Sequence, residues 1–186
     1  MTALAGPLAI AAVLLVAGGV AKVRTPLDTA NALRAVGIRV PPRLVRVGAA
    51  LEVLVGLGAL LVGNAVFAAL VAASYAAFAG FVVQALRTGA PISSCGCFGK
   101  VDTPPSLVHI VIDGALALVA AAVAVSGADV SLPAVVPDQP WLGIPFAMLV
   151  VIGAGLAFLA FSALPRALAA VTEVVEARDA ASRMPT

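Results

Sequence analysis

Residues 65–86 read AVFAALVAASYAAFAGFVVQAL, a run of twenty-two positions without a charged side chain. About 20 apolar residues in a helix cross the ~30 Å of hydrocarbon in a bilayer. Backbone groups in hydrocarbon must find their hydrogen-bond partners within the protein, and a helix supplies them. This stretch therefore predicts a membrane-spanning helix.

The composition of the whole chain points the same way. Of its 186 residues, 62% are hydrophobic and 11% are charged, whereas soluble domains average about 45–50% and about 25%. The mean hydropathy is +1.14. A soluble fold is excluded. The sequence also lacks a basic stripe with interleaved aromatic residues, so no binding of nucleic acid is expected.

Four further segments are long and apolar enough to span a bilayer. They are residues 3–21, 45–62, 106–125 and 141–164. The sequence therefore predicts an all-α integral membrane protein, a bundle of about five transmembrane helices. We expect the first segment to be a retained helix rather than a secretory signal, because no basic residue precedes it.

Three connections between these segments are longer than turns. Residues 26–42 combine apolar residues at helical spacing with Pro41-Pro42, which predicts a short interfacial helix followed by a break. Residues 128–140 hold three prolines and two aspartates, which is typical of a loop. Residues 167–186 alternate apolar and charged side chains, which predicts a soluble or surface-lying helix.

The basic residues predict an orientation in the cell membrane. They fall within residues 22–46, 87–100 and 166–183, which lie on alternate connections of a five-helix chain. Basic connections face the cytoplasm. The connection 87–105 would then lie in a reducing compartment. If the number of helices beyond the first connection differed from this prediction by an odd number, the connection 87–105 would face the outside instead.

The two cysteines of the chain, Cys95 and Cys97, lie in the segment SSCGCFGK of residues 93–100. A disulfide between them would be strained, and labile disulfides are the catalytic or regulatory ones. The intervening glycine permits the bend. A thiophilic ion such as Cu(I) is an alternative occupant of the pair, and plain packing of two apolar cysteines is another. A closed four-ligand zinc site is not expected, because the chain has a single histidine.

Glu52 falls inside the predicted span 45–62. An ionisable group at that depth is expensive and normally faces the bundle interior with a partner. We expect Glu52 to be protonated or paired with Lys22, Arg24 or His109. The alternative is that its helix begins later and that Glu52 lies near the headgroups.

His109 and Asp113 are separated by four residues and therefore share one face of the span 106–125. The imidazole of His109 could accept a thiol proton while Asp113 orients the ring. The alternative is a mutually satisfied polar pair that holds the bundle together.

In its order of features the chain resembles the methylamine-utilisation MauE membrane protein family, which is related to the DoxX group. The resemblance covers about residues 3–125 and rests on the end of the first helix, the paired prolines, the glutamate helix and the cysteine segment. These motifs are VAKVR at 20–24, PP at 41–42, LEVLVGL at 51–57, RTG at 87–89 and CGCFG at 95–99. Relatives often carry an Arg-Asn pair in the fourth helix, where this chain has Ile112-Asp113.

The resemblance implies a small helical bundle that takes part in thiol-disulfide chemistry. Members are thought to support a thioredoxin-like partner in the maturation of disulfide-bearing proteins. By this resemblance Cys95 and Cys97 are the redox pair, and Glu52 and Lys22 are polar residues inside the bundle.

The resemblance also divides the chain into three parts. Residues 1–126 would form the MauE/DoxX-like membrane helical domain. Residues 127–164 would hold an outer loop and the fifth transmembrane helix, and residues 165–186 a polar C-terminal tail.

The function predicted from the sequence is a thiol-disulfide relay. One cysteine attacks as a thiolate, and the other resolves the mixed disulfide formed with a thioredoxin-fold partner. An electron acceptor within the membrane, such as a quinone, is a hypothesis by analogy with other four-helix thiol oxidases, and no residue establishes it. Two alternatives stay open. One is a protein that binds or transports a thiophilic metal through Cys95 and Cys97, and the other is a non-catalytic membrane assembly factor.

Overall fold

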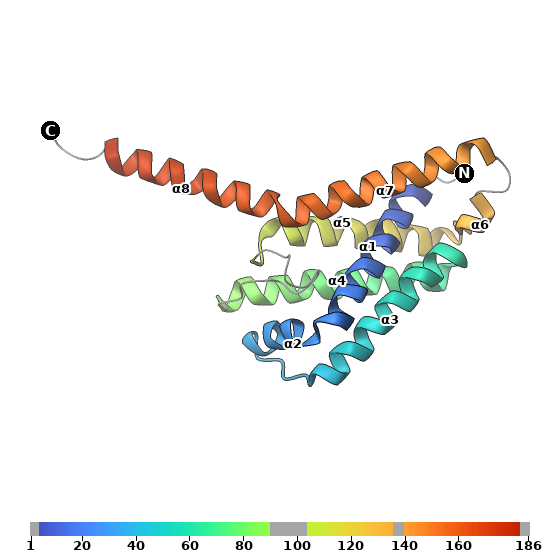
Figure 1. Ribbon diagram of the computed structural model, residues 1–186, viewed down its shortest axis with the longest axis horizontal. Coiled ribbons are helices and arrows are strands. Elements are labelled where there is room, and N and C mark those ends of the chain that lie inside the picture. The colour runs from blue at the N-terminus through green and yellow to red at the C-terminus, as the bar shows by residue number, and fades with distance from the viewer. Residues whose placement is uncertain (1–3, 90–103, 136–139, 183–186) are drawn as a thin grey trace.

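The computed structural model describes residues 4–89, 104–135 and 140–182, and within them all regular structure is helical (Figure 1). The helices are α1 Ala5–Arg24, α2 Pro26–Ala35, α3 Pro42–Leu61, α4 Ala65–Thr88, α5 Leu107–Ser126, α6 Leu132–Val135, α7 Pro140–Ser162 and α8 Leu164–Ser182. In the described ranges, five stretches of helix are long and apolar enough to cross a membrane: α1, α3, α4, α5 and the stretch Gly143–Thr172. The prediction of an all-α integral membrane protein with about five spans is confirmed.

The helices around the first connection are longer than hydropathy indicates. The first span ends at Arg24 rather than at residue 21, and α3 begins at Pro42 rather than at residue 45. Proline fits the first position of a helix because that position needs no N–H donor. As a result Lys22 lies in the last turn of α1 and Glu52 lies midway along α3. The alternative that the glutamate helix begins later than residue 45 is wrong.

Helix α2 closes one end of the bundle. It lies within the connection 26–42, where a short helix is predicted, and starts directly after Thr25 with a proline at its first position. Ala32 of α2 and Val36, which caps its C-terminus, pack with Ala85 near the C-terminal end of α4, and Phe81 lies against this cluster. The connection between α1 and α3 is therefore part of the packed structure.

The sequence predicts a loop over the connection 128–140. The structure differs, because this connection contains the four-residue helix α6. The backbone N–H of Ser131, directly before α6, donates to the Asp129 side chain at 3.1 Å. The N–H of Val130 donates to the Gly63 carbonyl at 3.3 Å. A Cβ on Gly63, which has φ +63°, would collide with Ser131. These local contacts order the short helix against the turn between α3 and α4.

Helix α1 occupies the centre of the bundle and contacts α3, α4, α5 and α7. Leu8 and Leu15 of α1 share one apolar core with Val71 of α4 and Val123 of α5. Helix α4 runs beside α5, and α8 continues from α7 and extends away from the other helices (Figure 1). The α8 helix agrees with the helical tail expected from the sequence, although it starts earlier, at Leu164.

Candidate functional site

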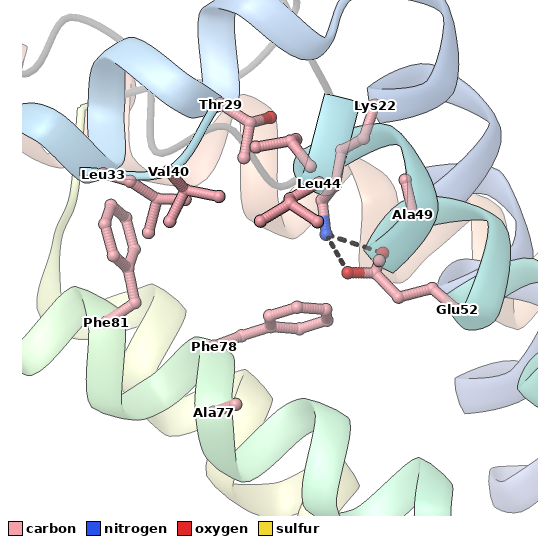
Figure 2. Close-up of a pocket in the computed structure, with 12 residues that line it drawn as sticks. Lys22, Thr29, Leu33, Val40, Leu44, Ala49, Glu52, Ala77, Phe78 and Phe81 are labelled. Atoms are coloured by element: carbon pink, nitrogen blue, oxygen red, sulfur yellow. Dashed lines mark hydrogen bonds and ion pairs between the residues drawn. The ribbon is translucent and has the colours of Figure 1, made fainter. Parts of the chain in front are cut away.

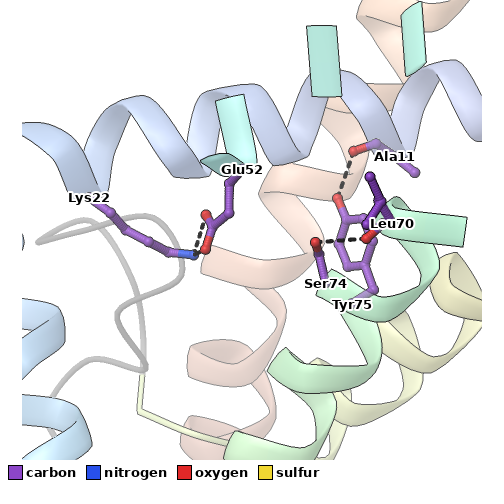
Figure 3. Close-up of polar contacts among 6 residues, drawn as sticks. All are labelled: Ala11, Lys22, Glu52, Leu70, Ser74 and Tyr75. Carbon is purple, nitrogen blue, oxygen red and sulfur yellow. Dashed lines mark hydrogen bonds and ion pairs between the residues drawn. The ribbon is translucent and has the colours of Figure 1, made fainter. Parts of the chain in front are cut away.

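The most polar feature of the bundle interior is an ion pair between α1 and α3. The ammonium Nζ of Lys22 donates to both carboxylate oxygens of Glu52, at 3.0 Å from Oε1 and 2.8 Å from Oε2 (Figure 3). The two side chains are 6% and 18% exposed. Of the partners considered for Glu52 from the sequence, the structure brings Lys22 to it.

Close packing of α1 against α3 brings this pair together. A Cβ on Gly19 would lie 2.8 Å from the carbonyl oxygen of Ala49, and one on Gly56 would lie 2.8 Å from the carbonyl oxygen of Ala12. Only small residues permit helix backbones to approach this closely. Lys22 follows Gly19 by about one turn, and Glu52 follows Ala49 by about one turn. Because α1 and α3 run antiparallel at this contact, the two residues lie on opposite sides of it along the helix axes. Their side chains lean toward the N-terminus of their own helix and so reach back to meet each other.

Aromatic residues of α4 surround the charged groups. The Nζ of Lys22 lies 4.0 Å from the centre of the Phe78 ring, which adds a cation–π contact. Phe78 in turn meets Tyr75 edge to face, with ring centres 5.7 Å apart. The Tyr75 hydroxyl donates to the Ala11 carbonyl at 2.7 Å and so ties α4 to α1 (Figure 3).

A cavity of about 310 Å³ opens beside the ion pair. Figure 2 shows the Lys22 ammonium and the Glu52 carboxylate on one side of the hollow, the Phe78 ring next to them, and the Phe81 ring across from them. Its other walls are small or apolar side chains of α2, α3, α4 and the α2–α3 connection: Thr29, Leu33, Val40, Leu44, Val45, Gly48, Ala49 and Ala77. This is an apolar chamber with one ionic wall.

His109 and Asp113 lie one turn apart in α5 and are 0% and 1% exposed. The Ser106 hydroxyl is 2.9 Å from Nδ1 of His109. The centre of the Phe161 ring, from α7, lies 5.5 Å from that of the imidazole. The contact with Ser106 and the complete burial beside Phe161 favour a structural role for His109, in which its side chain packs α5 against α7.

A void of about 10 Å³ separates Asp113 from the ion pair. Lys22, Glu52, Tyr75 and Asp113 all line it. This volume approaches that needed for one water molecule. The structure therefore brings Glu52 and Asp113, which are distant in sequence, to the lining of one small void.

Cys95 and Cys97 lie outside the described residues. The connection that carries them runs from Gly89, the C-cap of α4, to Ser106, the N-cap of α5. Both of these positions lie at the end of the bundle closed by α2. Among the described residues, no group of three or more His, Cys, Asp or Glu side chains could hold a metal ion.

The sequence analysis missed the aromatic residues of the site. Tyr75, Phe78 and Phe81 repeat every three residues along α4, and that spacing places them on neighbouring positions of one helix face. This stripe is the available signal in the sequence. No comparable signal marks Phe161, which reaches His109 from a distant helix.

One protein-family model matches most of the chain. The family model described as Methylamine utilisation protein MauE matches residues 1–127. This range takes in α1 to α5, and with them the ion pair, the cavity and the cysteine segment. No curated protein and no solved structure matches the chain significantly. The chain belongs to the MauE family.

Proposed function

We propose that this multi-pass membrane protein relays redox equivalents between Cys95/Cys97 and a thioredoxin-fold partner during the maturation of disulfide-bearing proteins. The family description, Methylamine utilisation protein MauE, supports a role in methylamine utilisation. The relay takes place at the surface of the cell membrane. Exchange proceeds when a thiolate attacks a disulfide sulfur, a mixed disulfide forms, and the second cysteine displaces the partner.

One observation carries this proposal. Both cysteines of the chain lie in the connection between Gly89 and Ser106, at the same end of the bundle as the buried Lys22–Glu52 pair and its cavity. Ionisable groups within membrane helices are costly, and they usually mark function. The two described ends of the cysteine connection and the helix α2 that walls the cavity thus lie in the same part of the bundle.

Trapping of mixed disulfides tests the relay. Cys95→Ser and Cys97→Ser variants should each retain a thiol that can attack but cannot resolve. We expect at least one of them to accumulate a covalent adduct with a thioredoxin-fold protein, which reductant releases. The helical content should be unchanged, because both positions lie in a connection.

A matched control separates a relay from ordinary surface reactivity. Thr88→Cys in a background without Cys95 and Cys97 places a single exposed thiol at the end of α4. This variant should form no specific adduct. If neither single serine variant forms an adduct, and the native pair stays reduced under mild oxidant, the relay is wrong.

The second candidate function is binding of a thiophilic metal. Two adjacent thiolates are the ligand type that Cu(I) prefers, and the described residues add no further ligand cluster. Stoichiometric retention of Cu(I) by the native protein, lost in both serine variants and accompanied by no thiol exchange, would favour this function.

A further inference from the structure

We propose that the cavity beside Lys22 and Glu52 binds the ring of a membrane quinone. The inference rests on the proposed thiol relay, because a relay that oxidises its partner must pass two electrons to an acceptor. It adds to that relay a binding site for the quinone and a direction of electron flow. The site itself consists only of residues that the structure describes.

The charges of the cavity select a neutral ligand. Its ionic wall is a paired ammonium and carboxylate, with contacts of 2.8 and 3.0 Å, so the wall carries no net charge. The remaining walls are almost entirely apolar. An anionic or cationic ligand would bury an unpaired charge, which costs several kcal/mol. Phospholipid headgroups and charged nucleotides therefore do not fit.

The shape of the cavity and its hydrogen-bonding groups favour a ligand with a flat ring that bears carbonyl oxygens. An ammonium has three N–H donors, and the Glu52 oxygens accept two hydrogen bonds from Lys22. The ammonium itself lines the cavity, so a ligand carbonyl that enters between it and the Phe78 ring can accept the third N–H in place of the present cation–π contact. Phe78 and Phe81 offer aromatic surfaces on which a flat ring can stack. An acyl chain would use neither feature.

The position of the cavity selects a ligand from the bilayer. Leu44, which lines the cavity, is 60% exposed. Three more apolar side chains follow Leu44 along the outward face of α3. They are Val47, Leu51 and Leu54, each at least 55% exposed. In a membrane this face lies against lipid. A volume of about 310 Å³ is at the lower end for small-molecule sites, about 300 Å³, so it holds a headgroup ring while an apolar tail stays in the lipid.

The redox balance closes with a quinone. The two thiols lose their S–H bonds and form one S–S bond, which releases two electrons and two protons. The quinone takes up both, and its two carbonyl groups become hydroxyls. Phe81 of the cavity lies about two helical turns before Gly89, where the cysteine connection starts. Electrons then flow from the partner's thiols to Cys95/Cys97 and on to the quinone.

Gly48 allows the cavity to be filled without disturbing the fold. It lines the cavity, and a Cβ built on it meets nothing within 4 Å. Gly48→Leu therefore places a side chain in the chamber with no backbone clash. Gly80→Leu is the matched control, because Gly80 is an exposed α4 residue with equally open space and lies outside the cavity.

The measurement is the thermal unfolding midpoint of purified protein in nanodiscs, titrated with decylubiquinone. A ligand that binds the native state raises the midpoint in a saturable way. We expect this rise in the native protein and in Gly80→Leu, and an apparent affinity at least ten-fold weaker in Gly48→Leu. Decylbenzene, which has the same tail but no carbonyl groups, should produce no saturable rise.

Each contrary outcome refutes one part of the proposal: the site, the ligand class or the relay. Equal binding by Gly48→Leu and native protein, or no binding by either, overturns the site. Equal binding of decylbenzene overturns the ligand class. The titration is repeated with Cys95→Ser/Cys97→Ser, which should still bind decylubiquinone. Binding without adduct formation would refute the relay and leave the site standing, whereas adducts without binding would refute the site and leave the relay standing.

Discussion

Removal of one partner of the Lys22–Glu52 pair should destabilise the bundle strongly. Lys22→Met leaves the Glu52 carboxylate, which is 18% exposed, without its ammonium partner. Glu52→Leu leaves the Lys22 ammonium, which is 6% exposed, without its carboxylate. Breaking a buried ion pair costs about 3–5 kcal/mol. Because the cavity admits some solvent or lipid to this pair, we expect the lower end, about 3 kcal/mol for each variant.

The double variant Lys22→Met/Glu52→Leu should recover most of this loss. An apolar pair of similar volume in place of a buried ion pair is often neutral or stabilising. The double variant should therefore be more stable than either single variant by about 2–3 kcal/mol. Arg24→Met is the matched control, since Arg24 is an exposed residue of the same helix, and it should change stability by no more than about 0.5 kcal/mol.

The assay is equilibrium unfolding in mixed micelles with rising dodecyl sulfate, followed by helical circular dichroism. The reasoning fails if each single variant loses less than about 1 kcal/mol and the two losses add in the double variant. Such values are typical of a solvent-exposed pair. The close packing of α1 on α3 would then not bury the charges as the structure indicates.

Three further predictions concern packing and topology. Gly56→Ala should lower the free energy of unfolding by about 1–3 kcal/mol, because the added Cβ meets the backbone of α1. Gly114→Ala is the control: a Cβ at Gly114 has open space around it, so this variant should be neutral or stabilising in the same assay. Tyr75→Phe loses a buried hydrogen bond to α1 and should cost about 0.5–1.5 kcal/mol, seen as a lower unfolding midpoint. Cysteines placed at Thr29 and Ser182 in a background without native cysteines should both resist an impermeant thiol reagent added outside cells, because basic segments face the cytoplasm; labelling of either from outside contradicts the five-span topology.

The number of spans could be predicted from the sequence, because hydropathy over about 20 residues is a property of the chain itself. Their ends could not. The spans predicted from hydropathy end at residue 21 and resume at residue 45. The helices themselves continue through Lys22 and Arg24 in α1 and include Arg43 in α3. Long basic side chains can carry their charge to the membrane surface while their helix stays in the bundle. The α6 helix was missed because its order depends on contacts with the distant Gly63.

The partner of Glu52 also depends on tertiary packing. Lys22 and Arg24 are two residues apart and therefore point in directions about 200° apart around α1. Either could face α3, depending on how the two helices cross. The close approach at Gly19 and Gly56 fixes that crossing. A glycine in an apolar helix indicates close packing, but the sequence does not say which helix it meets.

The ion pair and Asp113 border one small void in the bundle interior. Asp113, Lys22 and Glu52 line the same void of about 10 Å³. Phe161, 1% exposed, also lines that void and contacts the imidazole of His109. Phe161 belongs to α7, beyond the range that matches the family. The family core therefore supplies the charges and the cavity, while the fifth span excludes water from the far side of the same charges. Exclusion of water strengthens the pair electrostatically, so α7 contributes to the site although none of its residues carries a charge there.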